Sequence, residues 1–353
     1  MKLIHCADLH LDSPMESNLS AAKARERKNE ILSTFSDLVS IADRGEAAAV
    51  LIAGDLFDST RTSRKTERYV MDLINAHPDL YFFYLAGNHD SGCRLFEAEE
   101  KPANLLTFGE GWTPYDFGDV YIVGSENPNP DLLDLPKDRI NIVLLHGQKK
   151  DGGTGTGDVI PFRKYRNKNI DYMALGHLHA YQEAPLDDRG IACYSGCLEG
   201  RGFDECGQKG YVLLEVKNGK LTHTFTPMAR RTLHEVECDV SGVLSQHDLD
   251  ERVLAATEKI PSKDLVKVVL TGSYSAELLL DPVRVEQLLT SRFYFAKLKN
   301  KMRLEIHPED YTHDISLKGE FVRRVMESDL PTEEKEEIIA CGFRALCGEE
   351  LDV

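Results

Sequence analysis

Five short groups of aspartate, asparagine and histidine residues lie in the first 180 residues of the chain. They are Asp8-Leu9-His10, Gly54-Asp55-Leu56-Phe57-Asp58, Gly87-Asn88-His89-Asp90, His146-Gly147 and Gly176-His177-Leu178-His179. Carboxylate, imidazole and amide oxygen ligands suit Mn, Fe or Zn, and this set contains no thiolate. The groups therefore predict a metal site built from oxygen and nitrogen ligands.

One such group carries little weight, because an Asp-x-His or His-x-His sequence occurs by chance in many chains. A lone histidine at a strand end is more often a hydrogen-bonded structural residue than a metal ligand. Here the groups occur in a defined order, and glycines precede Asp55, Asn88 and His177. Glycine permits the sharp turns and close backbone approach that a crowded site needs. The joint occurrence favours a functional site over coincidental turns.

Short apolar strands that alternate with helices must position these groups. Strands are predicted at residues 2–7, 48–53, 81–86, 120–124, 140–145 and 172–175, and helices at 21–44 and 64–76. Such alternation predicts an α/β fold with a layered sheet covered on both faces. Ligand sites in these folds lie in the loops at the carboxyl ends of strands. All five groups follow predicted strands, so one sheet edge would bring them together.

The ordered motifs resemble those of the calcineurin-like metallophosphoesterases. Residues 4–11, 54–58 and 196–205 are similar to the Mre11/SbcD nuclease branch of that family, and the resemblance covers about residues 1–230. The later part resembles the cap domain and C-terminal helices of bacterial Mre11-like proteins of the YhaO type. The resemblance implies an α/β sandwich of two mixed β-sheets flanked by helices, with a smaller α+β cap domain and C-terminal helices.

The resemblance also implies two divalent metal ions, with Mn²⁺ expected and Fe, Zn or Mg as alternatives. One ion would be held by Asp8, His10, Asp55 and His179, and the other by Asp55, Asn88, His146 and His177. Asp55 would then bridge the ions. His89 matches the family's histidine that protonates the leaving oxygen, and Asp58 matches the carboxylate that orients that histidine. Because every motif position is filled, we expect an active phosphodiester hydrolase.

The remainder of the chain predicts two further parts. A boundary near residues 227–231 separates a nuclease domain (1–229) from a small α+β cap domain (230–315) and a C-terminal helical segment (316–353). In the cap we expect strands at 232–240, 264–271 and 301–306, and helices at 249–258 and 282–292. Two short helices are expected at 319–328 and 332–347.

The leading functional hypothesis is a Mn²⁺-dependent DNA exonuclease or endonuclease of DNA repair. The resemblance implies a Rad50/SbcC-like coiled-coil ATPase as its partner, and it is consistent with a homodimer. One alternative is a phosphodiesterase or phosphatase that acts on small nucleotides with the same metal centre. The other is an assembly component of an ATPase complex, against which the complete set of catalytic residues argues.

The net charge of −17 lowers the expectation of DNA binding, since nucleic-acid binders are usually basic. Part of this charge comes from the segment after residue 300, and bound cations would add positive charge at the site. Basic residues near the motifs are candidate phosphate contacts or simply solvated faces: Arg61, Arg64, Lys65, Arg68, Lys149, Lys150, Arg163, Lys164, Arg166 and Lys168. The glycine-rich stretch 151–157 lacks the Lys-Ser/Thr of a phosphate-binding loop, which favours a plain loop.

The N-terminal residues carry charged and polar groups where a secretion signal needs an apolar stretch. The longest apolar runs, at 47–53 and 80–86, are too short to span a bilayer. Eight cysteines without a CxxC pair predict reduced thiols, and Cys193 with Cys197 lacks the second pair that a zinc site would need. We therefore expect a cytoplasmic protein without a membrane partner.

Overall fold

The computed structural model describes residues 1–15, 19–58, 62–90, 101–151, 159–275, 278 and 280–346. The chain forms two compact units, Met1–Thr232 and Leu233–Val353. The three-part division at residues 229 and 315 stays a prediction.

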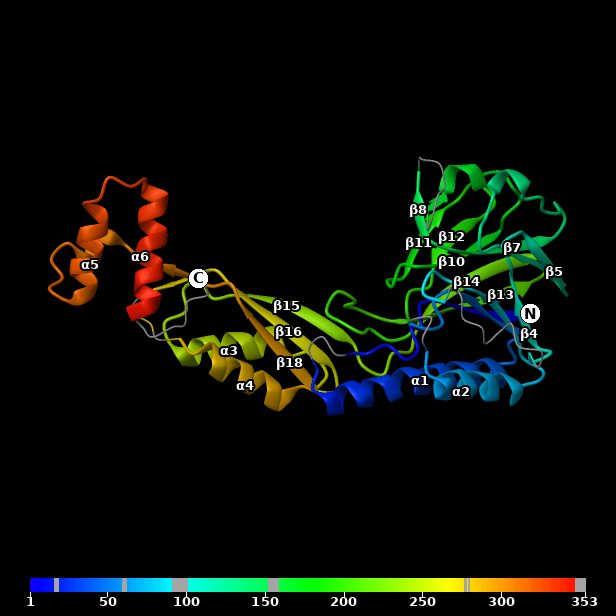
Figure 1. Ribbon diagram of the computed structural model, residues 1–353, viewed down its shortest axis with the longest axis horizontal. Helices are drawn as coiled ribbons and strands as arrows, with labels where there is room; N and C mark the ends of the chain where they lie inside the picture. Colours follow the sequence, from blue (N-terminus) through cyan, green and yellow to red (C-terminus); the bar gives the residue numbers. More distant parts are fainter. Residues whose placement is uncertain are drawn as a thin grey trace. The chain divides into compact units, whose positions relative to one another are not determined.

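Two six-stranded mixed sheets form the framework of the first unit (Figure 1). One sheet has the order β14 (Lys220–Pro227), β13 (Gly210–Lys217), β1 (Lys2–Cys6), β2 (Ala49–Ala53), β3 (Tyr81–Leu85) and β4 (Leu105–Thr107). The other has the order β11 (Gln182–Pro185), β12 (Ile191–Tyr194), β10 (Tyr172–Gly176), β7 (Ile140–His146), β6 (Val120–Gly124) and β5 (Thr113–Phe117). Neighbours among β1 to β4 are parallel, as are neighbours among β6, β7, β10 and β12. The predicted α/β sandwich of two mixed sheets is confirmed.

Alternation along the buried strands explains how the two sheets stack. In β2, Ala49 and Leu51 join the core between the sheets, whereas Val50 and Ile52 join the core beneath the helices. The strands of the second sheet alternate in the same way, between the shared core and a core on that sheet's outer face. Both faces of each sheet are therefore apolar, which is why these strands appear in the sequence as continuous apolar runs.

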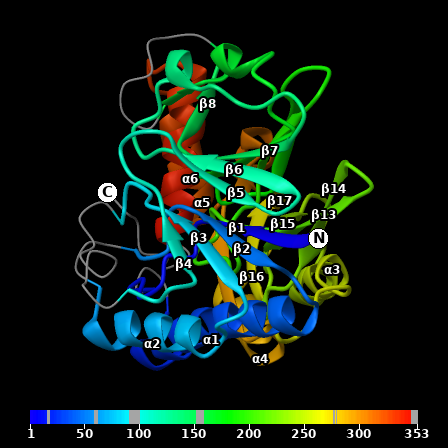
Figure 2. The ribbon, with the colours of Figure 1, turned by 90° about the vertical axis from the view of Figure 1, so that its right-hand side faces the viewer.

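Helices α1 (Ala21–Arg44) and α2 (Arg64–Asn75) lie together along the outer face of the first sheet (Figure 2). Each begins at a serine, Ser20 or Ser63, whose hydroxyl accepts a hydrogen bond from a backbone N–H of the first turn. The unit also contains the short 3-10 helices η2 (Pro130–Leu132) and η3 (Phe162–Tyr165) and the pair β8 (Gln148–Lys150) with β9 (Val159–Pro161).

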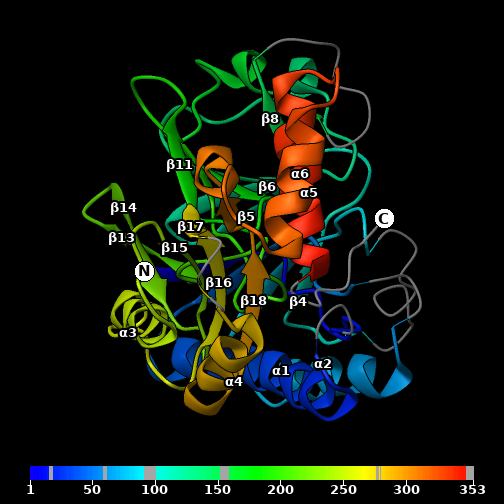
Figure 3. The same ribbon diagram turned by 90° about the vertical axis from the view of Figure 1, so that its left-hand side faces the viewer.

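The second unit has a parallel three-stranded sheet of β15 (Leu233–Asp239), β16 (Leu265–Thr271) and β18 (Phe295–Asn300). Helices α3 (Gln246–Ala256) and α4 (Pro282–Arg292) pack on it through a shared apolar core. A two-stranded pair, β17 (Ser273–Ser275) with β19 (Arg303–Glu305), precedes η4 (Pro308–Tyr311) along the chain. Helices α5 (Leu317–Met326) and α6 (Thr332–Leu346) lie side by side around Val322, Ile339 and Phe343 (Figure 3).

One strand of this unit was not predicted. The strand expected at residues 301–306 is present as β19, which pairs with β17, whereas the third strand of the parallel sheet is the unpredicted β18. Lys297 and Lys299 interrupt the apolar residues of β18, so the strand lacks the continuous apolar run that marks a buried parallel strand. The lysines are tolerated because β18 lies at the edge of its sheet.

Two further findings concern the described residues as a whole. No helix among them is both long enough and apolar enough to cross a membrane. Five of their cysteines, Cys6, Cys193, Cys197, Cys238 and Cys341, are free thiols. Arg61, Cys93, Cys347 and the glycine-rich stretch 152–157 lie outside the described residues.

Candidate metal centre

The loops that follow β1, β2, β3, β7 and β10 meet at one place, because these strands end at the same edge of the two stacked sheets. Ligand-type atoms within each of three groups lie within 4.8 Å of one another. The groups are Asp8 with His10 and His179, Asp8 with Asp55 and His146, and His10 with Asp58 and His89. The structure thus brings together side chains that are as far apart in sequence as Asp8 and His179.

Asn88 and His177 complete the cluster. The Asn88 amide oxygen lies 2.9 Å from His146 Nε2, which in turn lies 3.4 Å from Asp55 Oδ2. The His177 ring stands edge-on to that of His146, with ring centroids 5.5 Å apart, and its backbone N–H donates to Asp8 Oδ1 at 2.8 Å. All seven residues that the resemblance assigns to the metals therefore lie in one cluster.

Close backbone approach at this edge depends on glycine. A Cβ atom on Gly176 would lie 1.9 Å from the carbonyl oxygen of Ala53, so the ends of β10 and β2 could not meet as they do. Gly54 has a φ of 91°, and a Cβ there would lie 2.1 Å from His146 Nδ1. The predicted reason for the glycines, close approach in a crowded site, fits both positions.

The backbone itself is strained at the cluster. Asp8, His10 and Asp55 have positive φ angles of 54°, 45° and 52°, and His177 has a φ of 102°. Such conformations cost on the order of 1–3 kcal/mol each and persist only where the surroundings impose them. Four candidate ligands in one cluster with this strain are typical of a functional site.

The arrangement of acceptor atoms fits a cation. Asp8 is fully buried, its Oδ2 has no hydrogen-bond partner, and burial raises the pKa of its carboxyl group to about 6. A second buried carboxylate, Asp55, lies in the same group of closely spaced ligand atoms. Two buried carboxylates repel each other unless positive charge lies between them. The residues present therefore fit divalent ions.

The surroundings of His146 also favour a positive charge. Its Nδ1–H donates to the carbonyl of Ala53 at 3.0 Å, which leaves the Nε2 lone pair facing the oxygen atoms of Asn88 and Asp55. Burial opposes the charged imidazolium, but the Asp55 carboxylate outweighs it and raises the pKa of His146 to about 9. Burial likewise opposes the charged form of Asp55, but His146 and the His89 N–H lower the pKa of Asp55 to about 2. A metal ion satisfies the same environment that would otherwise favour a proton.

His89 lies at the edge of the cluster and is exposed, with its ring centroid 4.9 Å from that of His10. Its Nδ1 lies 2.9 Å from the backbone carbonyl oxygen of Asp58. The Asp58 carboxylate instead accepts from Arg201 at 2.7 Å and lies 3.2 Å from His10 Nδ1. The contact that orients His89 in the structure thus comes from the Asp58 backbone, whereas the resemblance led us to expect its carboxylate.

Two charged residues of the site received no role from the sequence, although they lie within the stretch 196–205. Glu205 accepts a hydrogen bond from His179 Nδ1 at 2.7 Å, and Arg201 Nη2 donates to the same carboxylate oxygen at 2.9 Å. Burial opposes its ionisation, but His179 and Arg201 outweigh it and lower the pKa of Glu205 to about 2. Both residues lie on a long connection between β12 and β13, where no periodicity indicates what a side chain contacts.

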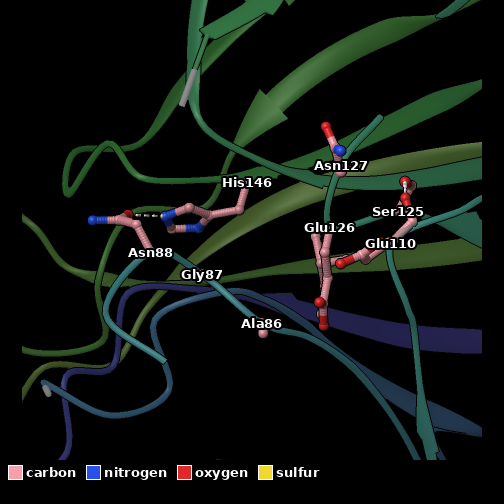
Figure 4. A pocket seen from close by; sticks show the side chains of 9 residues that line it. Ala86, Gly87, Asn88, Glu110, Ser125, Glu126, Asn127 and His146 are labelled. Carbon is pink, nitrogen blue, oxygen red and sulfur yellow. Dashed lines mark hydrogen bonds between the residues drawn. The ribbon is translucent and has the colours of Figure 1, made fainter. Parts of the chain in front are cut away.

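A cavity of about 330 Å³ opens beside Asn88 and His146 (Figure 4). Glu110, Glu126 and Asn127 contribute polar side chains to its wall. No lysine or arginine of the described residues lines it. Burial, followed by the nearby Glu110, raises the pKa of the Glu126 carboxyl group. The cavity is therefore acidic although it adjoins a site that fits cations.

The predicted basic groups occupy varied settings. Arg64, Lys65 and Arg68 are exposed on α2, as expected of a solvated face. Lys149 lies over the Phe162 ring, with Nζ 4.8 Å from its centroid, and Lys164 pairs with Asp131 at 3.7 Å. None of these contacts involves the candidate metal-ligand side chains.

Comparison with known proteins gives a consistent picture. Residues 1–181 match the family model described as calcineurin-like phosphoesterase. The chain is 26% identical to the uncharacterised metallophosphoesterase YhaO of Bacillus subtilis over 305 residues, covering 80% of this chain and 74% of YhaO. It is 25% identical to the DNA double-strand break repair protein Mre11 of Sulfurisphaera tokodaii, covering 77% and 73% of the two chains. It is also 25% identical to a component of the nuclease SbcCD of Staphylococcus saprophyticus, covering 65% and 69%.

Proposed function

The chain belongs to the calcineurin-like phosphoesterase family, and we propose that it is a two-metal phosphodiesterase whose substrate is DNA. The observation that carries the proposal is that seven candidate ligand side chains from both sheets lie in one cluster, which includes the buried Asp8 carboxylate with its unpartnered Oδ2. Mn²⁺ is the proposed metal, since carboxylate, imidazole and amide oxygen ligands suit it. The free thiols of Cys6, Cys193, Cys197, Cys238 and Cys341 are consistent with the proposed cytoplasmic location.

In the proposed mechanism, Asp8, His10, Asp55 and His179 would hold one ion, and Asp55, Asn88, His146 and His177 would hold the other. When bound, two ions supply an activated water and neutralise charge on the phosphate. His89 Nδ1–H donates to the Asp58 carbonyl, so the doubly protonated ring would carry its second proton on Nε2, deliver it to the leaving oxygen and remain as the neutral imidazole. The protein's own contribution is therefore to fix the ligands and to hold one proton at the open edge of the site.

DNA is favoured as the substrate by the relatives, among which are a protein named for DNA repair and a component of a nuclease. One observation favours the second candidate, a phosphodiesterase of small nucleotides. The cavity beside Asn88 is lined by Glu110 and Glu126 and by no lysine or arginine of the described residues, so it would repel a further phosphate. A nucleoside without a second phosphate fits this cavity better than the interior of a polynucleotide.

The proposed partner is a Rad50/SbcC-like coiled-coil ATPase. Apolar side chains are exposed around the paired C-terminal helices, and these are Ile315, Leu317, Met326, Leu330, Ile338 and Leu346. Exposed apolar side chains grouped on one element mark interaction sites more often than scattered ones do. The alternative, in which the chain serves mainly as an assembly component, needs this surface but not the metal centre.

The test is hydrolysis of linear duplex DNA, single-stranded DNA, bis-p-nitrophenyl phosphate and cyclic nucleotides by the purified chain with Mn²⁺. We expect cleavage of DNA and of the small diester, and a loss of more than about 100-fold in both activities in Asp8→Ala, because a metal ligand is removed. Cleavage of small diesters with DNA untouched, even when the ATPase is present, would establish the small-nucleotide function. Wild-type activity in Asp8→Ala would overturn the metal assignment.

A further inference from the structure

The Nε2 atoms of two histidine rings lie unusually close together in the candidate metal centre. His10 Nε2 and His179 Nε2 lie 3.2 Å apart, and both belong to the cluster around Asp8. A neutral imidazole carries a proton on one nitrogen and a lone pair on the other. The identity of the group that contacts each Nδ1 therefore decides whether the facing Nε2 atoms offer lone pairs or protons.

Two groups lie near His179 Nδ1, and the nearer one decides where the proton sits. Arg201 Nη2 is the more distant group, at 3.4 Å, and it also donates to Glu205 Oε1 at 2.9 Å. Glu205 Oε1 lies 2.7 Å from His179 Nδ1, and an ionised carboxylate only accepts hydrogen bonds. His179 must therefore hold a proton on Nδ1, and Nε2 of the neutral ring is left with its lone pair. The Glu205 side chain is only 4% exposed, so water competes little with this contact.

For His10 the partner is the Asp58 carboxylate, whose Oδ1 lies 3.2 Å from Nδ1. Asp58 Oδ1 is poorly aligned with the His10 Nδ1–H bond, so His10 Nδ1 makes no hydrogen bond of good geometry. The negative charge still favours a proton on Nδ1. The Nε2 lone pairs of His10 and His179 then face each other. Two facing lone pairs repel, and a bound cation would remove that repulsion.

A single arginine joins the two carboxylates. Arg201 Nη1 donates to Asp58 Oδ1 at 2.7 Å, while Nη2 and Nε donate to Glu205 Oε1 at 2.9 and 3.2 Å. The planar guanidinium fixes directions as well as distances, so it holds the loop after β2 and the connection after β12 in one geometry. Lysine could not make all of these contacts at once.

The backbone beside Arg201 is itself anchored on α1. Arg27 Nη2 donates to Glu199 Oε2 at 3.1 Å and to the Gly200 carbonyl at 2.9 Å, and the Arg27 and Glu199 side chains are fully buried. Thr34 donates to the other oxygen of Glu199 at 2.7 Å. The position of Arg201 therefore depends on the core of the unit and not on a free loop.

We propose that Glu205 and Arg201 are positioning residues of the metal centre. Glu205 sets the Nδ1–H tautomer of His179, and Arg201 holds Glu205 and Asp58 so that both histidine Nε2 atoms remain available to one metal ion. This inference rests on the proposed two-metal function. It also assigns the Asp58 carboxylate to His10 and Arg201, leaving only its backbone to orient His89.

The experiment measures Mn²⁺ binding to the metal-free full chain by calorimetry, together with the ring ¹⁵N signals of His179. Glu205→Met removes the acceptor, and we expect one of two Mn²⁺ sites to weaken by about 10–100-fold while the other stays within about threefold. Glu205→Gln retains an oxygen acceptor and should weaken the same site less. Arg201→Lys should also weaken it. Asp204→Asn is the matched control, since Asp204 is an exposed carboxylate on the same connection, and it should bind as the wild type does.

Unchanged affinity at both sites in Glu205→Met, or a His179 signal that keeps the Nδ1–H tautomer there, would overturn the proposal. If Glu205→Met fails to fold, the ring signals of Glu205→Gln and Arg201→Lys decide the question. Failure of the proposed function gives a different result, in which the wild type binds no Mn²⁺ and hydrolyses no diester. The tautomer of His179 in the metal-free protein still tests its contact with Glu205 in that case.

Discussion

At the scale of single residues, the proposed mechanism assigns different roles to three buried candidate ligands and to one exposed histidine. Asp8, His10 and Asp55 are almost completely buried, whereas His89 is exposed at the rim. Buried ligands would exclude water from bound ions, and an exposed histidine could reach leaving groups that differ from one substrate to another. The two kinds of residue should therefore respond differently to mutation.

His89→Ala should separate substrates by their leaving groups. A deoxyribose hydroxyl is a poor leaving group that needs a proton, so we expect DNA cleavage to fall by about 10²–10⁴-fold. p-Nitrophenolate leaves without a proton, and hydrolysis of bis-p-nitrophenyl phosphate should fall by less than about tenfold. Turnover numbers for both substrates with the same Mn²⁺ concentration check this. Equal losses on the two substrates would show that His89 does not act as the acid.

At the scale of elements, strand ends predicted the site well and long connections did not. The helix over residues 21–44 and the strands before all five motifs lie where the sequence placed them, because continuous apolar runs and serine caps specify them locally. Strand β18 was missed because alternating lysines resemble an exposed segment. The roles of Arg201 and Glu205 could not be derived, since contacts to Asp58 and His179 arise only when two distant loops meet.

The ends of β2 and β10 lie so close together that no side chain fits at Gly176. In Gly176→Ala, the new Cβ would lie 1.9 Å from a backbone oxygen that cannot move independently, so we expect a loss of about 1–3 kcal/mol in the free energy of unfolding and weaker Mn²⁺ binding. Gly109→Ala is the control, because a Cβ there meets nothing within 4 Å, and its effect should stay within about 0.5 kcal/mol. Urea unfolding of both variants gives the comparison. Equal stability would contradict the close contact.

Strand β1 contains a buried histidine that should make stability depend on pH. His5 is fully buried, its Nδ1 lies 2.9 Å from the Tyr172 hydroxyl, and burial lowers its pKa to about 3. The unfolded chain binds a proton at His5 below about pH 6.5, whereas the folded chain does so only near pH 3. This contribution is fully present above pH 6.5 and is lost as the pH falls towards 3, at about 1.4 kcal/mol per pH unit.

His5→Asn should remove this part of the pH dependence, since asparagine does not titrate. Urea unfolding of the metal-free wild type and variant at pH 7 and pH 5 provides the test. We expect the wild type to lose about 2 kcal/mol more than the variant between these values. Parallel losses would show that His5 is not the responsible group.

At the scale of the whole molecule, each unit has its own apolar core, and the candidate metal-ligand side chains all belong to the first unit. The exposed apolar side chains around α5 and α6 belong to the second. Hydrolysis of a small diester and association with an ATPase should therefore be separable by mutation.

Leu317→Lys should abolish co-purification with a coiled-coil ATPase partner, because it places a charge on a leucine that is 71% exposed at the start of α5. Hydrolysis of bis-p-nitrophenyl phosphate should remain within about twofold. Leu244→Lys, at a leucine of similar exposure before α3, is the control and should leave association intact. Loss of association in both variants, or in neither, would count against the C-terminal helices as the docking site.

The left-handed backbone at Asp8, His10, Asp55 and His177 has a consequence for evolution. Outside glycine, this conformation is occupied mainly by asparagine, aspartate and histidine, and β-branched residues are nearly excluded from it. A descendant that lost hydrolysis would therefore be restricted to replacements from the same small set, whatever its new role. Its sequence would still resemble that of an enzyme. Conservation of these motif positions would therefore reflect the requirement for a left-handed backbone as well as selection for catalysis.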